Sequence, residues 1–156
     1  REGARAKQYA ESLLWLEHAG LISRARRVTK PGMPLSAYDD CKSFKVFLLD
    51  VGLLGAMSEL PPSAILGGNR IFEEFKGALT EQYVCQQLVS DCGCTPFYWS
   101  AENSSGEIDF LVQDSGSVFA MEVKAEENLR AKSLRAFKAA HPDVKAVRFS
   151  LPVGLS

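Results

Sequence analysis

The most regular alternation of apolar and polar residues lies in GEIDFLVQDSGSVFAMEVK, residues 106–124. Two alternating runs flank a short polar break, so the pattern predicts a β-hairpin with a tight turn at residues 115–116. In that turn Asp114 lies opposite Ser117. Because side chains alternate along a strand, this single pairing fixes the predicted register of the whole hairpin.

The predicted register gathers four ionisable residues at the open end of the hairpin. Asp109 is expected directly opposite Glu122, and Glu107 directly opposite Lys124. Opposed carboxylates repel by on the order of 3 kcal/mol at an effective dielectric near 20. A divalent cation between them would reverse that sign. The alternative is a solvated face with a Glu107–Lys124 ion pair, worth less than about 1 kcal/mol. The other face is wholly apolar and is predicted to be core: Ile108, Phe110, Val112, Phe119, Met121 and Val123.

Hydrophobic periodicity predicts the remaining elements. Helices are expected at residues 5–19, 50–58, 70–91 and 129–140, and further strands at 21–29, 44–50, 95–100 and 144–150. A linker rich in proline and glycine near residues 60–69 predicts two units, 1–60 and 61–156. The second unit has the order α-β-β-β-α-β and is expected to form a mixed sheet with helices packed on it. The first has the helix, strand, loop, strand order that ends a winged-helix module.

A third acid is expected to approach the hairpin from the helix at 70–91. The residues one or two turns away from Glu81 on its helical face are all small or apolar: Gly77, Ala78, Val84, Cys85 and Leu88. An acid within such an inward-facing stripe is costly unless it has a cation or a hydrogen-bonding partner. Two interpretations stay open: Glu81 joins a metal site, or it pairs with a lysine or arginine.

Basic residues are predicted to concentrate in two places. The loop-strand segment has a charged edge that we expect to contact phosphates, with a solvated β-ribbon as the alternative: Arg24, Arg26, Arg27 and Lys30. The helix at 129–140 offers a second basic face, for which ordinary solvated charges are an equal alternative: Lys132, Arg135 and Lys138.

Composition narrows the functional classes. The net charge of −1 gives no global attraction to nucleic acid or membrane, so any basic surface is local. The chain has no signal-peptide pattern and no apolar stretch long enough to span a bilayer, so a cytoplasmic protein without membrane contact is expected. The four cysteines, Cys41, Cys85, Cys92 and Cys94, lack the usual zinc spacing and are expected to be reduced thiols.

Three acidic and basic signals follow one another in the predicted order α-β-β-β-α-β: Glu81 on the first helix, Asp109 in GEIDF, and Glu122-x-Lys124 in MEVK. This pattern resembles the PD-(D/E)xK nuclease superfamily, which has the restriction endonuclease-like fold. Residues 9–150 also resemble a C-terminal domain of unknown function that follows an AAA-type ATPase domain in many prokaryotic proteins. The quoted stretches that carry this resemblance are FKVFLLDVGLLGAM, FKGALTEQYVCQQL, YWSAENSSGEIDFLV and EVKAEENLRAKSLRAF.

The resemblance implies a Mg²⁺- or Mn²⁺-dependent nuclease-like domain that acts on DNA. Asp109, Glu122 and Glu81 would hold the metal, and Lys124 would act on the attacking water. An upstream ATPase domain is the expected partner, and a homo-oligomer stays open. The chain begins within a helical pattern and without an initiator methionine, and it has no P-loop motif, so ATP is expected only in a domain outside this chain. The alternatives are a catalytically inactive DNA-docking or regulatory module and a pure protein-interaction domain.

Overall fold

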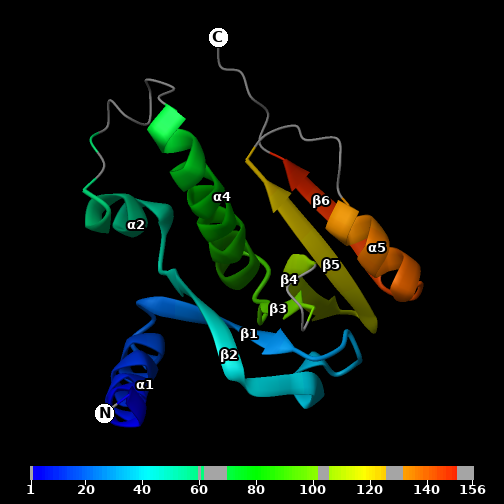
Figure 1. Ribbon diagram of the computed structural model, residues 1–156, viewed down its shortest axis with the longest axis horizontal. Coiled ribbons are helices and arrows are strands. Elements are labelled where there is room, and N and C mark those ends of the chain that lie inside the picture. The colour runs from blue at the N-terminus through cyan, green and yellow to red at the C-terminus, as the bar shows by residue number, and fades with distance from the viewer. Residues whose placement is uncertain (1, 60, 62–69, 102–105, 126–131, 151–156) are drawn as a thin grey trace.

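The computed structural model describes residues 2–59, 61, 70–101, 106–125 and 132–150 of the chain (Figure 1). Its helices are α1 (Glu2–His18), α2 (Val51–Met57), α4 (Arg70–Ser90) and α5 (Lys132–Ala140), with a 3₁₀ helix at Leu35–Tyr38. Its strands are β1 (Ile22–Val28), β2 (Asp39–Leu48), β3 (Phe97–Ser100), β4 (Glu107–Asp114), β5 (Ser117–Lys124) and β6 (Lys145–Ser150). None of the described helices combines the length and apolar character that a membrane crossing requires.

The described strands form one six-stranded mixed sheet in the order β2-β1-β3-β4-β5-β6. The pairs β1–β2, β3–β4 and β4–β5 are antiparallel, whereas β1–β3 and β5–β6 are parallel. The mixed α/β class and the order α-β-β-β-α-β from α4 onward are confirmed.

Helices cover both faces of this sheet. Along one face α4 crosses the middle of the molecule, and α5 lies beside β6 (Figure 1). The α4 side has a buried cluster: Ala25, Phe47, Val84, Cys85, Leu88, Tyr98, Phe110, Val112, Met121 and Val123. The α5 side has a second cluster: Val28, Leu35, Phe97, Ile108, Leu111, Val118, Ala120, Leu134, Phe137 and Val144. The sheet therefore has two buried faces, as is usual for a mixed sheet with helices on both sides.

The hairpin has the predicted register. The cross-strand partners run from Asp114↔Ser117 to Phe110↔Met121, as the tight turn requires. Ser115 and Gly116 both have positive φ, 47° and 77°, which is the backbone that a two-residue type I′ turn needs. A local turn thus determines the pairing of β4 with β5.

Strand β2 begins earlier than the sequence indicates. It was expected at residues 44–50, but it starts at Asp39, which pairs with Val28 across a bulge. The carboxylates of Asp39 and Asp40 accept hydrogen bonds from the backbone nitrogens of residues 41–43, and Cys41 has a φ of 57°. These are turn features, and only the pairing with β1 makes the segment part of a strand.

The sheet runs across the predicted boundary at residue 60. β1 precedes the boundary and pairs with β3, which follows it, through Arg26↔Phe97 and Arg27↔Tyr98. Residue 60 and residues 62–69, the segment expected to be a linker, lie outside the described residues. The division into a winged-helix-like unit and a nuclease-like unit remains a prediction from the sequence. In the structure, strands from both sides of the predicted boundary belong to one sheet.

Candidate functional site

Helix α4 presents the predicted acid to the sheet. Val84, Cys85 and Leu88 are buried in the α4-side cluster, as the inward-facing stripe predicted. Glu81 lies one turn earlier, and its side chain is 32% exposed. Burial raises the pKa of Glu81 above its ordinary value, and the attraction of Lys45 opposes that rise without cancelling it. Glu81 is therefore a half-buried carboxylate held against a cation.

A bulge in β4 changes which face the next acid occupies. Phe97 pairs with Leu111, but Trp99 pairs with Ile108, so two residues of β4 stand opposite Tyr98. Ile108 belongs to the α5-side cluster and Phe110 to the α4-side cluster. The prediction that these two share a face is wrong, because strict alternation fails at a bulge.

Asp109 is the extra residue at this bulge, and it lies near Glu81 and Lys45. The negative charge of Asp109 contributes to raising the pKa of both Lys45 and Glu81. Asp109 is 9% exposed, and its Oδ2 accepts a 2.7 Å hydrogen bond from the backbone nitrogen of Val123. Burial raises the pKa of Asp109, although this hydrogen bond and the nearby lysines lower it. The carboxylate therefore borders the Glu122–Val123 peptide of β5.

Lys45 of β2 lies at the centre of this acidic group, and sequence reasoning missed it. Its Nζ lies 3.5 Å from Glu81 Oε2, forms an ion pair with Glu107 and stands 5.2 Å from the centroid of the Tyr98 ring. Burial lowers the pKa of Lys45, but the carboxylates of Glu107 and Glu81 outweigh it, so the pKa is raised. The sequence did contain a signal for Lys45. It lies two residues before Phe47 in a predicted strand, so the two side chains point to the same, inward-facing side.

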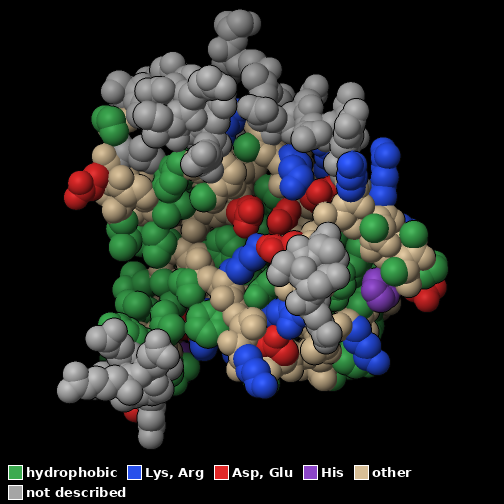
Figure 2. Space-filling model, in the orientation of Figure 1, with side chains coloured by type: hydrophobic (Ala, Val, Ile, Leu, Met, Phe, Trp, Pro, Cys, Tyr) green, Lys and Arg blue, Asp and Glu red, His purple; other side chains and the backbone are tan. Residues whose placement is uncertain are grey.

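These contacts select between the alternatives left open by the sequence. Glu81 does pair with a lysine, in agreement with one of its two interpretations. The Glu107–Lys124 ion pair of the alternative interpretation is not seen among the described residues, and Glu107 pairs with Lys45 instead. Figure 2 shows the resulting group of acidic and basic side chains near the centre of the face that carries α4.

Glu122 and Lys124 form a second charged pair at the end of β5. Glu122 Oε1 lies 3.4 Å from Lys124 Nζ, and the Glu122 side chain is 5% exposed. Its Oε2 is buried and has no hydrogen-bond partner within the described part of the chain. Met121 and Val123 pack on the α4 side, so by alternation Glu122 turns toward the α5 side. Asp109 and Glu122 were predicted to stack on one face. Instead, Asp109 joins Glu81 and Lys45 on the α4 side, and Glu122 pairs with Lys124 on the other side of β5.

The carboxylates have the donor atoms that a divalent cation prefers, but those described are not gathered around one point. Carboxylate oxygens are the donors that Mg²⁺ prefers, and the unpartnered oxygen of Glu122 is such a donor. However, the described residues contain no cluster of three or more acidic, histidine or cysteine side chains arranged to hold a metal. The lysines occupy positions beside the carboxylates.

The expected phosphate-contacting edge is neutralised by acids. Arg24 pairs with Glu17, Arg26 with Asp39 at 3.3 Å and Arg27 with Asp40 at 3.0 Å. Arg27 also donates to the hydroxyl and carbonyl oxygens of Ser100, so it ties β1 to β3. Lys30 stands over the ring of Tyr38, with Nζ 4.6 Å from its centroid. These basic residues are engaged within the fold, and their local net charge is close to zero.

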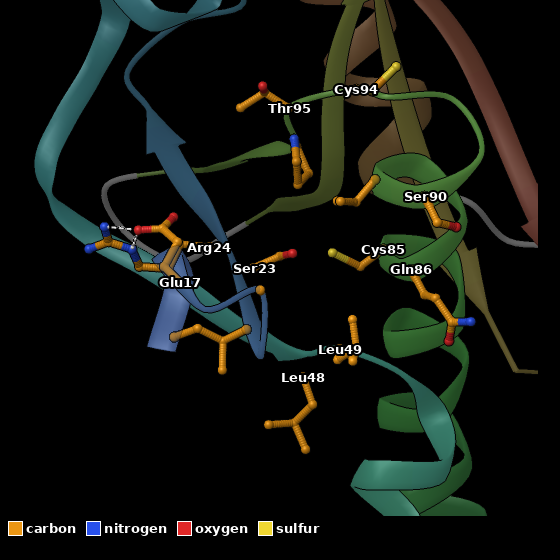
Figure 3. A pocket seen from close by; sticks show the side chains of 14 residues that line it. Glu17, Ser23, Arg24, Leu48, Leu49, Cys85, Gln86, Ser90, Cys94 and Thr95 are labelled. Atoms are coloured by element: carbon orange, nitrogen blue, oxygen red, sulfur yellow. Dashed lines mark hydrogen bonds and ion pairs between the residues drawn. The ribbon is translucent and has the colours of Figure 1, made fainter. Parts of the chain in front are cut away.

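A cavity of about 320 Å³ lies between β1, the end of β2 and α4, and none of the acids around Lys45 lines it (Figure 3). Its charged lining residues, Glu17 and Arg24, are paired with each other. Cys85 also lines it, but burial raises the pKa of this thiol to about 12, so it is not a nucleophile near neutral pH. Cys94 lines it too, and burial also raises the pKa of that thiol, so neither cysteine of the cavity is an activated nucleophile.

Two family models match the chain. Residues 76–153, half of the chain, match the domain of unknown function DUF4143, and residues 1–64 match a second domain of unknown function, DUF8612. No curated protein and no solved structure matched. The protein is a mixed α/β domain with a charged site at the strand ends. It belongs to the DUF4143 family. Such domains commonly lie next to AAA ATPase domains, which confirms that part of the resemblance.

Proposed function

We propose that the chain is a metal-dependent nuclease-like domain that acts on DNA phosphodiesters, within a protein that also carries an AAA-type ATPase domain. The observation that carries the proposal is a pair of buried carboxylates, Asp109 and Glu122, at the same end of β4 and β5. Burying a carboxylate is costly even when it is partly satisfied, as both of these are, so two of them at one end of the sheet mark a candidate functional site. Lys124 beside Glu122 completes the set.

Each residue has a defined role in this proposal. Asp109 and Glu122 would hold Mg²⁺ or Mn²⁺ through their carboxylate oxygens, with Glu81 contributing directly or through water. Such a metal polarises a phosphate oxygen and lowers the pKa of a bound water. The Lys124 ammonium would orient or deprotonate the attacking water and stabilise negative charge that develops on the phosphate. For all three carboxylates to converge on one metal, Glu122 would have to turn from the α5 side of β5 toward Asp109, and Lys45 would have to give up its contact with Glu81.

The position of Lys45 favours a second candidate function. Its ammonium already neutralises Glu81 and Glu107 without a metal. A domain in which a lysine has taken over this role would be catalytically inactive, and it would serve the ATPase as a DNA-docking or regulatory module. The two functions differ in one property, which is whether the carboxylates bind a divalent cation.

Cleavage of DNA tests the first function. Supercoiled plasmid and branched DNA are incubated with the protein and millimolar Mg²⁺ or Mn²⁺, with EDTA as the blank. We expect cleavage that Asp109→Asn and Lys124→Met abolish. Asp114→Asn is the matched control, since it makes the same change on the same strand at the exposed turn, and it should cleave like the wild type.

Calorimetric titration separates the two candidates when no cleavage is seen. If the wild type binds Mn²⁺ and Asp109→Asn does not, the metal site is supported. The substrate would then be a DNA structure other than the two tested. Absence of both cleavage and metal binding at millimolar Mn²⁺ would refute the nuclease proposal. Salt-sensitive DNA binding that persists in EDTA would then support the docking module.

A further inference from the structure

Two of the four cysteines lie just beyond the end of α4, with a single residue between them. Cys92 and Cys94 follow the last residue of the helix, Ser90, in the segment that leads to β3. Both are free thiols, and Cys92 is exposed whereas Cys94 is half-buried. Cys41 lies on β2 and Cys85 within α4. The proposed nuclease chemistry uses none of these thiols.

The backbone holds both of these cysteines in place. The Cys92 nitrogen donates to the carbonyl oxygen of Gln87 at 3.2 Å, and the Cys94 nitrogen donates to that of Leu88 at 2.8 Å. Between them, Gly93 has a φ of 62°, a left-handed conformation that glycine adopts without strain. These contacts fix both cysteines to the end of α4, and the left-handed glycine turns the chain between them.

Both cysteines line one cavity of about 370 Å³ between the end of α4 and the end of β4. The Cys94 Sγ donates a hydrogen bond to the carbonyl oxygen of Cys92, at 3.7 Å, so one thiol is directed toward the other residue. Figure 3 shows Cys94 on the segment after α4, where its sulfur points away from Cys85. Neither Cys41 nor Cys85 lines this cavity. Cys92 and Cys94 are therefore a local pair to which the other two thiols do not contribute.

The surroundings of the pair disfavour a free thiolate. Asp114, the last residue of β4, lines the same cavity, and none of the described lining residues is basic. Burial raises the pKa of the Cys94 thiol, and the negative charges of Cys92 and Asp114 raise it further. The pair is therefore not poised as a nucleophile. A cation that bonds to both sulfurs would offset this repulsion, because a thiol that binds a metal is deprotonated outright.

The ligand atoms select the kind of cation. Thiolates prefer soft cations such as Cu⁺, whereas Mg²⁺ and Mn²⁺ prefer oxygen. A structural Zn²⁺ takes four ligands, and its paired cysteines are usually separated by at least two residues. The described residues contain no group of three or more such ligands, so the pair is too small a set for Zn²⁺. It is sufficient for Cu⁺, which two sulfur ligands satisfy.

We propose that Cys92 and Cys94 bind a soft monovalent cation, Cu⁺, through their two sulfur atoms. Each thiol releases its proton to solvent as its sulfur binds the cation, so two S–H bonds break, two Cu–S bonds form, and copper keeps its oxidation state. The site lies at the opposite end of β4 from Glu107 and Asp109. It is therefore independent of the proposed nuclease function.

Competition with a chromogenic chelator measures the binding. The thiols are reduced with a phosphine that is then removed, and the protein is titrated anaerobically with Cu⁺ in the presence of bicinchoninate. We expect the wild type to withhold one equivalent of Cu⁺ per chain from the chelator, and Cys92→Ser and Cys94→Ser to withhold none. An excess of Mg²⁺ should leave the wild-type result unchanged, because a hard cation does not compete for sulfur.

A matched control and a direct measurement locate the ligands. Cys41→Ser removes an exposed thiol that lies outside the cavity, so this variant should still withhold one equivalent. Circular dichroism checks the folding of each serine variant. X-ray absorption at the copper edge of the loaded wild type needs no variant, and it should show two sulfur ligands. Size-exclusion chromatography should show the same oligomeric state with and without Cu⁺, because both ligands come from one chain.

Several results would overturn the two-thiol site. The wild type could leave all of the Cu⁺ to the chelator, or Cys92→Ser and Cys94→Ser could both bind as the wild type does. Loss of binding in Cys41→Ser would place the ligands elsewhere. Half an equivalent per chain together with a copper-induced dimer would show a site shared between two chains. Displacement of Cu⁺ by an equal concentration of Zn²⁺ would contradict the choice of a soft monovalent cation.

Discussion

Replacing Lys45 with methionine removes the charge at the centre of the site and keeps a side chain of similar length. The Nζ–Oε2 distance to Glu81 is 3.5 Å, which at an effective dielectric of 20 corresponds to about 5 kcal/mol of attraction before desolvation. The two side chains are 25% and 32% exposed, so the net value lies between that of an exposed and that of a buried pair. We expect a loss of about 2 kcal/mol at pH 8, or about 4–8 °C in Tm.

The pH dependence of this loss identifies its cause. Burial raises the pKa of Glu81 and Asp109 in the folded protein, so these carboxyls favour folding most below their unfolded pKa and lose that contribution as pH rises through the folded pKa. Lys45 lowers both pKa values, and its removal raises them further. The difference between Lys45→Met and the wild type should therefore be largest at pH 8 and shrink as the acids become protonated toward pH 4.

Urea denaturation at several pH values, followed by circular dichroism, measures this difference. Lys42→Met is the control, since Lys42 lies on the same strand and is exposed, and its change should stay within about 0.5 kcal/mol. An equal loss at pH 8 and pH 4 would refute the electrostatic explanation and assign the effect to packing of the lysine stem. A Lys45→Met protein as stable as the wild type at pH 8 would refute the ion pairs themselves.

Three further predictions concern stability and reactivity. Gln82→Leu should cost about 2–4 kcal/mol in urea denaturation, because the buried Gln82 amide donates to the Leu48 carbonyl at 2.7 Å and accepts from the Leu48 nitrogen at 2.9 Å, and both backbone groups would lose a partner. Asp50→Ala removes the N-cap of α2 and should lower the free energy of unfolding by about 1 kcal/mol, measured in the same way. In thiol labelling with a chromogenic disulfide reagent at pH 8, the exposed Cys92 should react at once, whereas Cys85, whose pKa is raised to about 12, should react only on unfolding.

Local signals were sufficient for the elements and for the hairpin. The turn at Ser115 and Gly116 specifies the pairing of β4 with β5 from within the segment, and the structure has the predicted register. The helix at Arg70–Ser90 and the strand at Lys145–Ser150 also agree with the periodicity within a residue. These features depend on neighbours in the sequence, which is why their pattern is legible there.

The arrangement of the charges depended on distant partners. The bulge that moves Asp109 to the α4 side comes from the pairing of β4 with β3, and no residue of the hairpin specifies it. Likewise, the basic edge of β1 was visible in the sequence, but the acids that neutralise it, such as Asp40 against Arg27, lie before the strand predicted at 44–50, so no predicted pairing brings them to β1.

The sequence by itself determined the mixed α/β class, the order of the elements, the hairpin register and the identity of the candidate acids, since each follows from local periodicity and turn chemistry. Only the tertiary structure decided which cation the acids meet. Lys45 is 36 residues from Glu81 in the chain, and the two meet because α4 packs on the face of the sheet that the inward side chains of β2 line. Which cation a carboxylate contacts depends on the residues packed around it, and the fold determines which residues those are.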